Sequence, residues 1–262
     1  MLEPIRHIIS RQRNILASSS IRRKEILQSV QFNFEIIRPE FEENLDKNSF
    51  THPCEYVKEN AKQKALSVWR QLARNNNDDD NNNVADLVIG CDTVVTLDEK
   101  IYEKPKDDSD AIRMLMKLSG RTHTVFTGVA LITRSKSISS STATSTLLTT
   151  NIADQQQQQQ TLSTTMAIQP QQMKKSSSLL CIDGDDYLVT TFHEATDVTI
   201  SEMDKTIIES YVKTGEPLDK AGSYGIQGIG ATLIESIRGD YFNVVGLPLH
   251  RLAKELYYMY TE

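Results

Sequence analysis

The sequence has few cysteines and no long apolar run, and each absence argues against certain classes of protein. The three cysteines in 262 residues are far apart and form no C-x-x-C pair, which argues against a disulfide framework or a zinc site and favours a reducing compartment. No apolar run approaches the ~20 residues that span a membrane, and residues 1–13 lack the apolar core of a signal peptide. We therefore expect a cytoplasmic protein without a membrane partner, with organelle targeting by the basic residues of this N-terminal extension as the alternative.

Positive charge is also scarce. Lysine and arginine total 29 against 35 aspartates and glutamates, so the formal net charge at pH 7 is −6. Binding to DNA or RNA needs a basic face, so we expect no nucleic-acid partner. A single nucleotide needs only a few cations and remains compatible with this composition.

Two stretches of the chain have too few apolar residues to fold. Residues 75–83 read NNNDDDNNN, and residues 135–178 are rich in serine and threonine and include six consecutive glutamines. Such segments bury too little apolar surface to offset the entropy lost on ordering. We interpret both as low-complexity inserts in a single domain that covers residues 14–262.

The rest of the chain alternates between strand and helix patterns. This alternation, with some hairpin pairing, predicts an α/β fold with a mixed sheet flanked by helices. Strands are expected at 14–17, 34–37, 87–97 (as a buried pair), 125–132 and 187–200, the last two paired. Helices are expected at 22–30, 53–73 and 108–118, with a further helix opened by residues 201–204 and burying Ile207, Ile208, Tyr211 and Val212.

The segment ILASSSIRRKEIL, residues 15–27, combines an apolar run, three serines and a basic helix start. A helix N-terminus presents unpaired backbone N–H groups and a partial positive charge, and arginine forks suit phosphate oxygens. The segment therefore favours a phosphate-binding loop. The alternative is a serine N-cap followed by solvated basic residues on an ordinary helix.

A carboxylate interrupts the apolar run LVIGCDTVV, residues 87–95, at Asp92. Burying an unpartnered carboxylate is unfavourable, so we expect Asp92 at a strand end that faces a cleft. There it could bind a metal or accept a proton from water. The alternative is an aspartate that starts a turn between two strands.

An acidic segment and two lysines supply further candidate residues. The acidic segment PEFEE, residues 39–43, offers oxygen ligands that suit Mg²⁺ or Mn²⁺, although a solvated acidic loop explains it equally well. Lys64, on the apolar face of its helix, and Lys104 are candidate phosphate cations. Each alone is more typical of a surface lysine.

The densest segment is TGEPLDKAGSYGIQGIGA, residues 214–231. Its five glycines allow the backbone to approach a ligand closely, and Gln227 can both donate and accept hydrogen bonds, as discrimination between base edges requires. The spacing fits neither a dinucleotide-binding G-x-G-x-x-G motif nor a phosphate P-loop. A glycine-rich loop without a ligand is the alternative.

Together these segments resemble the Maf family of nucleoside triphosphate pyrophosphatases. The motifs in common occur in the family's order and cover nearly all of residues 14–256 outside the two inserts. They are LASSSIRRKEIL, PEFEE, AKQKA, VIGCDTVV, EKP, LSGRTHTVFTGVAL, TGEPLDKAGSYGIQGIGA and IRGDYFNVVGLPL. The resemblance implies an elongated mixed sheet, two lobes with a central cleft, a homodimer and a divalent metal, Mg²⁺ or Mn²⁺.

The resemblance also implies roles for individual residues. Asp92 corresponds to the catalytic proton acceptor, and Glu43 and Asp92 correspond to metal ligands. The phosphate-binding positions fall on Ser18, Ser20, Arg22, Arg23, Lys64 and Lys104, and the specificity positions on Arg22, Thr93 and Gln227. The usual proline, glycine and two aspartates are replaced by Ile21, Ser19, Glu40 and Glu42, which affects helix entry and metal geometry more than the reaction.

The specificity set resembles that of the subgroup that hydrolyses dTTP and UTP to the monophosphate and pyrophosphate. Two alternatives remain open at this point. One is the same fold acting on modified or methylated purine triphosphates, and the other is a nucleotide-binding regulator without catalytic activity.

Overall fold

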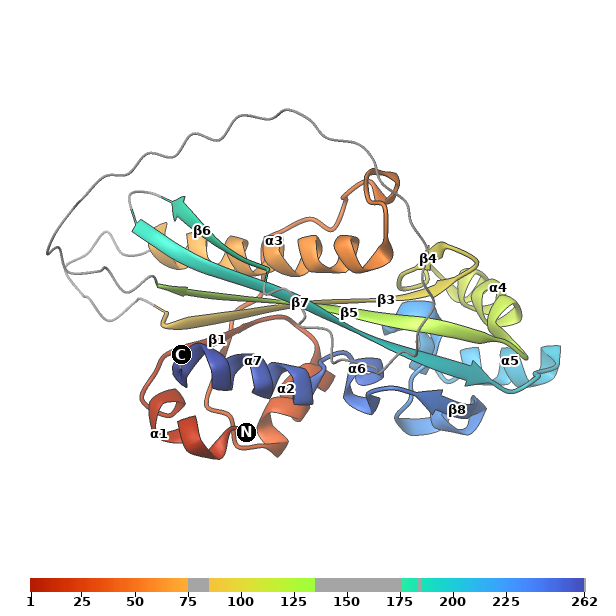
Figure 1. The fold of residues 1–262 in the computed structure, drawn as a ribbon. Helices are drawn as coiled ribbons and strands as arrows, with labels where there is room; N and C mark the ends of the chain where they lie inside the picture. Colours follow the sequence, from red (N-terminus) through yellow and green to blue (C-terminus); the bar gives the residue numbers. More distant parts are fainter. Residues whose placement is uncertain (75–84, 135–175, 183–184, 262) are drawn as a thin grey trace, which may run out of the picture. The chain divides into compact units, whose positions relative to one another are not determined.

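A computed structural model describes residues 1–74, 85–134, 176–182 and 185–261 of the chain (Figure 1). The predicted insert at 75–83 and most of that at 135–178 lie outside the described residues. The last three residues of the second predicted insert belong to strand β6 (Ser176–Ile182). The described residues lie in a single compact unit, to which Ile5 and Ile9 of the N-terminal extension contribute buried side chains. The domain start at residue 14 stays a prediction.

Within the described residues, eight strands form one mixed sheet, which confirms the predicted fold class. Their order is β2–β1–β3–β5–β7–β6, with β4 paired to β3 and β8 paired to β7. Strand β1 is parallel to β2 and β3, and the other pairs are antiparallel. The strands are β1 Asn14–Ala17, β2 Glu35–Ile36, β3 Leu87–Leu97, β4 Lys100–Tyr102, β5 Thr122–Arg134, β6 Ser176–Ile182, β7 Asp185–Ile200 and β8 Ile234–Arg238.

Strand β3 has the predicted bounds but is not divided in two. Its eleven residues form one continuous strand, so the prediction of a strand pair at 87–97 is wrong. The turn comes later, where Asp98 and Glu99 connect β3 to β4. These two residues have positive φ angles of 50° and 61°. The predicted pairing of 125–132 with 187–200 is confirmed by the β5–β7 ladder.

Helices cover both faces of the sheet, with α3 on one face and α1, α2 and α7 on the other (Figure 1). The helices are α1 Arg6–Ile9, α2 Ile21–Ser29, α3 Pro53–Arg74, α4 Asp108–Leu118, α5 Lys205–Val212, α6 Tyr241–Val245 and α7 Leu249–Thr261. Short 3-10 turns are η1 Glu3–Ile5, η2 Lys47–Ser49, η4 Glu216–Asp219, η5 Ala221–Ser223 and η6 Gly228–Leu233.

The start of α5 also differs from the prediction. The helix begins at Lys205, and the side chain of Asp204 caps it by accepting a hydrogen bond from the Ile207 backbone N–H. Ile207 is 43% exposed, so its predicted burial is wrong, whereas Ile208, Tyr211 and Val212 are buried as predicted. The strong cap at Asp204 therefore decided the helix start, rather than the acidic run before it.

Helix α3 packs unusually close to the sheet because two strand residues opposite it are glycines. A Cβ atom on Gly90 would lie 2.1 Å from the Ala61 carbonyl oxygen, and one on Gly128 would lie 2.4 Å from that of Val57. Only glycine fits at such distances. The close approach brings the side chain of Lys64, which lies on the inner face of α3, down to strand β3.

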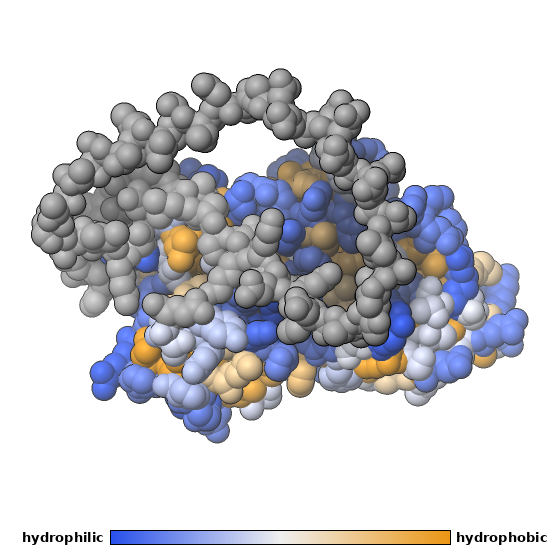
Figure 2. Space-filling model, in the orientation of Figure 1, coloured by the Kyte–Doolittle hydropathy of each residue, from blue (hydrophilic) through white to orange (hydrophobic). Residues whose placement is uncertain are grey.

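The apolar core is divided along the sheet. One cluster contains Ile89 and Cys91 of β3 and packs against α2 and α7, whereas another contains Val95 of β3 and packs against α4 and α5. Asp92 therefore lies between the two clusters, as the predicted two-lobed arrangement requires. On the face shown in Figure 2, hydrophobic residues occur as small separate patches among hydrophilic ones. None of the described helices is long and apolar enough to cross a membrane.

Candidate active site

The candidate site lies beside β3, at a gap in the strand pairing along one edge of this strand. Strand β1 pairs with β3 only as far as Gly90, and β4 pairs with it only from Val95 onward. Among the described residues, no strand therefore pairs with residues 91–94 of β3 on that side. Asp92 lies in this gap, in the interior of β3 and not at a strand end as predicted, because it is the neighbouring strand that stops.

The side chain of Asp92 is buried in an ion-pair cluster with two partners. The Lys64 ammonium lies 2.7 Å from Asp92 Oδ1 and 2.7 Å from Glu43 Oε2. Asp92 is 7% exposed and Lys64 is 6% exposed, whereas the Glu43 side chain is about half exposed. The cluster supplies the partner that a buried carboxylate requires, so Asp92 is not the turn residue of the alternative interpretation.

The two carboxylates of this cluster respond differently to their surroundings. Burial raises the pKa of Asp92 and outweighs the attraction of Lys64. Burial also acts on Glu43, but the charges of Lys64, Lys104 and Arg23 hold the pKa of Glu43 below its ordinary value. Asp92 is therefore the stronger base of the two, which suits a proton acceptor.

The donor set fits a divalent cation that is shared with a ligand. Two carboxylates around one ammonium leave an excess negative charge, and hard oxygens are the ligands that Mg²⁺ and Mn²⁺ prefer. No cluster of three or more acidic, histidine or cysteine side chains suited to a metal occurs in the described part of the chain. The pair thus resembles the sites in which Mg²⁺ is held by one or two carboxylates together with substrate phosphates.

Arg23 joins three segments at the same gap. Its guanidinium donates hydrogen bonds to the Gly246 carbonyl at 2.8 Å, to Ser18 Oγ at 3.1 Å and to Thr93 Oγ1 at 3.1 Å. Thr93 in turn shares a hydrogen bond with Thr127 on β5. Arg23 is therefore fixed in the site and is not the solvated surface residue of the alternative interpretation.

The serine loop caps helix α2 and contacts the Arg23 side chain, and its phosphate-binding role stays a prediction. Ser20 is the N-cap of α2, as the alternative interpretation has it, because its side chain accepts from the Arg23 backbone N–H. Ser18 Oγ accepts from the Ser20 N–H at 3.2 Å and also contacts the Arg23 side chain. The loop thus folds around the arginine that points into the gap.

The three predicted specificity residues line one small pocket. Arg22, Thr93 and Gln227 surround it together with the buried ring of Tyr224 and apolar residues that include Val245. Successive residues of a strand point to opposite faces, so Thr93 and this pocket lie across β3 from the side chain of Asp92. A larger open hollow over the β3–β4 turn, of about 1000 Å³, contains none of the predicted residues.

Two predicted phosphate-binding residues make no direct contact with the carboxylate cluster that the structure records among its described residues. Arg22 is engaged by Asp219, with the guanidinium 2.8 Å from Asp219 Oδ2 and 3.1 Å from its carbonyl oxygen. Lys104 is exposed, and its charge is close enough to help lower the pKa of Glu43. The remaining predicted residues converge around the gap in β3.

Comparison with known proteins identifies the family of this chain. A family model described as Maf-like protein matches residues 13–175 and 150–259. The chain belongs to the Maf family. The predicted family is therefore confirmed.

Relatives of this Maf-family protein have been named for their activity. The chain is 36% identical over 242 residues to the dTTP/UTP pyrophosphatase of Bacillus cytotoxicus (strain DSM 22905 / CIP 110041 / 391-98 / NVH 391-98), covering 92% of this chain and 93% of the relative. It is 37% identical over 242 residues, with the same coverage, to the dTTP/UTP pyrophosphatase of Bacillus cereus (strain AH820). It is 38% identical over 260 residues to the probable bifunctional dTTP/UTP pyrophosphatase/methyltransferase protein of Homo sapiens, covering 99% of this chain but only 34% of the human protein.

Sequence reasoning missed several polar residues around the site of this Maf-family protein. Asn243 is fully buried. Its side-chain amide donates to the Val125 carbonyl and to Thr196 Oγ1, and its backbone carbonyl accepts from the Thr127 hydroxyl. A lone asparagine in the apolar run YFNVVG was the available signal for it. Asp219, the partner of Arg22, is 197 residues away in sequence, and no local pattern indicates that pairing.

Proposed function

We propose that the chain hydrolyses dTTP and UTP to the corresponding monophosphate and pyrophosphate. The observation that carries the proposal is the Asp92–Lys64–Glu43 cluster, which lies at the gap in β3 beside Arg23. The names of the bacterial relatives, which align over nearly their whole length, support the choice of substrates.

The geometry supports a division of the nucleotide between the two faces of β3. The triphosphate would lie along the gap, where the cations on Lys64 and Arg23 can neutralise its charge. Ser18, Ser20, Arg22 and Lys104 are the further phosphate-binding residues of the proposal. The base would enter the pocket on the other face, where the hydroxyl of Thr93 and the amide of Gln227 offer donors and acceptors to its edge.

The proposed reaction begins with a water molecule held by the Asp92 carboxylate. Asp92 accepts a proton from this water as its oxygen attacks the α-phosphorus. The bond between the α-phosphorus and the bridging oxygen to the β-phosphorus breaks, and pyrophosphate leaves with that oxygen. Burial raises the pKa of Asp92 and makes it a better base, while Lys64 stabilises the charge that builds up on the phosphates.

Glu43 and Asp92 would hold Mg²⁺ or Mn²⁺ together with phosphate oxygens. A bound metal would supply positive charge to the triphosphate. We further propose a homodimer that works in the cytoplasm, as the family resemblance implies. Sedimentation of the purified protein at several concentrations tests the dimer.

The proposed activity is tested by measuring pyrophosphate release from purified protein with all common nucleoside triphosphates and several modified ones. The measurement is made with and without added Mg²⁺ or Mn²⁺. We expect turnover of dTTP and UTP that depends on the metal. Preference for a guanine or methylated purine nucleotide would reject the pyrimidine assignment, and binding without turnover would identify a regulator.

A further inference from the structure

The loop that carries Gln227 contains glycines, which give its backbone high conformational freedom. Gly225 and Gly228 flank the glutamine, and Gly228 has a φ of 69°. Glycine loses more conformational freedom on folding than any other residue. The Gln227 side chain is exposed and, among the described residues, has no hydrogen-bonded partner. Its position at the pocket rim therefore depends on whatever fixes the loop.

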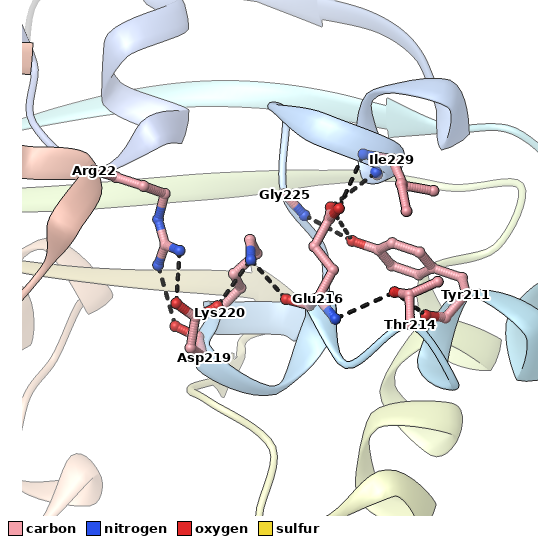
Figure 3. A network of polar contacts seen from close by, with 9 residues as sticks. Arg22, Tyr211, Thr214, Glu216, Asp219, Lys220, Gly225 and Ile229 are labelled. Carbon is pink, nitrogen blue, oxygen red and sulfur yellow. Dashed lines mark hydrogen bonds and ion pairs between the residues drawn. The ribbon is translucent and has the colours of Figure 1, made fainter. Parts of the chain in front are cut away.

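The Glu216 carboxylate holds the part of this loop that follows Gln227 in the sequence, and Figure 3 shows its contact with the loop at Ile229. Its Oε2 accepts from the Ile229 N–H at 2.9 Å, and its Oε1 accepts from the Gly230 N–H at 2.9 Å. The same carboxylate lies against Gly228, where a Cβ atom would be 2.8 Å from Oε2. A single side chain thus satisfies two consecutive backbone donors that follow the glutamine.

The Tyr211 hydroxyl fixes the loop on the other side. It donates to Glu216 Oε1 at 3.0 Å and accepts from the Gly225 N–H at 3.2 Å. Gly230 packs against the same hydroxyl, since a Cβ atom there would lie 2.5 Å from it. Tyr211 belongs to α5 and its side chain is buried in the core, so its hydroxyl is held in a fixed position.

The anchor formed by Glu216 and Tyr211 is also connected, through hydrogen bonds, to Arg22 in the lining of the pocket. Lys220 donates to the Glu216 carbonyl at 2.6 Å and to Asp219 Oδ1 at 2.8 Å, and Asp219 binds Arg22. Although burial favours the neutral acid, the N–H groups of Gly230 and Ile229 and the Tyr211 hydroxyl hold the pKa of Glu216 below its ordinary value. Glu216 is therefore ionised at neutral pH, and its bonds to the loop are the stronger charge-assisted kind.

We propose that Glu216 and Tyr211 are positioning residues that hold Gln227 where it can recognise the pyrimidine base. This inference rests on the proposed function, because it concerns the same pocket. Neither residue lines the pocket itself, so neither would touch the nucleotide. Their effect on selectivity passes through the 225–230 loop.

Two substitutions remove the anchor without altering the pocket lining. In Glu216→Gln, an amide NH₂ must face one of the backbone N–H groups and leaves it unsatisfied. In Tyr211→Phe, the ring stays in the core and only the hydroxyl is lost. Glu235→Gln is the matched control, because it makes the same charge change at an exposed position of β8.

The test compares kcat/KM for UTP and GTP in these variants. We expect Glu216→Gln and Tyr211→Phe to reduce kcat/KM for UTP by about 10- to 100-fold, mainly through KM, and to narrow the preference for UTP over GTP. Glu235→Gln should behave as the unmodified protein. If the ratio of kcat/KM for UTP to kcat/KM for GTP is unchanged in both anchor variants, the proposal is overturned. An equal loss for the two nucleotides is such a result.

Amide hydrogen exchange of the ligand-free protein gives a readout that needs no activity. We expect faster exchange at residues 225–230 in Glu216→Gln and Tyr211→Phe, with the rest of the sheet unchanged. Unchanged exchange in this loop would refute the anchor even if the enzyme hydrolyses UTP. Absence of turnover in the unmodified protein would instead refute the proposed function and leave the exchange measurement to decide on the anchor.

Discussion

Substituting Lys64 by methionine should destabilise the protein in a way that depends on pH. Methionine fills a similar volume but removes the ammonium that lies 2.7 Å from both Asp92 and Glu43. Breaking a buried ion pair from one side leaves an uncompensated charge and typically costs about 3–5 kcal/mol. Asp92 can avoid this penalty only by taking up a proton.

The sign of the pH dependence follows from the pKa values of the two carboxylates. In the unmodified protein the pKa of Asp92 is raised, whereas the pKa of Glu43 is lowered, so their effects on stability oppose each other. Without Lys64, burial holds the pKa of Asp92 further above its value in the unfolded chain, and Glu43 loses the nearest of the charges that lower its pKa. The folded variant then binds more protons than the unfolded one, and its stability falls as the pH rises through the raised pKa of Asp92. For each group, each pH unit above the raised pKa increases the loss in the free energy of unfolding by at most about 1.4 kcal/mol.

Urea denaturation of the unmodified protein and of Lys64→Met between pH 5 and pH 8 measures this effect. We expect a small difference in the free energy of unfolding at pH 5 that grows to about 3–5 kcal/mol at pH 8. Lys62→Met is the matched control on the same helix, because Lys62 forms a partly exposed pair with Glu59 at 3.4 Å. That pair should contribute less than about 1 kcal/mol. Equal losses in the two variants, or a loss for Lys64→Met that does not grow with pH, would refute the reasoning.

Three further outcomes follow from the site and the fold. Asp92→Asn should lower kcat for pyrophosphate release by about 100-fold or more, because the proton acceptor is lost, while calorimetry still detects nucleotide binding. Arg23→Lys should lower kcat/KM by about 10- to 100-fold, since an ammonium cannot replace the planar fork that binds Ser18, Thr93 and the Gly246 carbonyl. Gly128→Ala should destabilise the protein to urea by about 1–3 kcal/mol, because a Cβ atom would collide with the backbone of α3.

A different result would contradict each of these three predictions. Full turnover by Asp92→Asn would remove Asp92 from the mechanism. Unchanged kinetics in Arg23→Lys would show that a point charge suffices at that position. A Gly128→Ala variant as stable as the unmodified protein would show that α3 can move away from the sheet without penalty, and the short distance from Lys64 to Asp92 would lose its explanation.

Local patterns predicted most of the elements because they depend on neighbouring residues. The apolar spacing of residues 53–73 predicted helix α3 to within one residue. The errors occurred where two local signals competed. At residues 201–205 a helix opened by Ser201 with an acidic first turn was predicted, whereas Asp204 is the cap. At Gly90 and Asp92 turn-prone residues suggested a break in β3 that the sheet does not contain.

The residues with candidate roles could be named from the sequence because the types of side chain and their order carry the family resemblance. The sequence by itself determined an α/β chain with strands, helices, a basic loop and one carboxylate in an apolar strand. Only the tertiary structure decided that β1 stops beside Asp92, that α3 comes close enough for Lys64 to bridge two carboxylates, and that Glu216 anchors the loop of Gln227. Those contacts join residues far apart in the chain, and their distances depend on how whole strands and helices pack, which no local pattern of residues encodes.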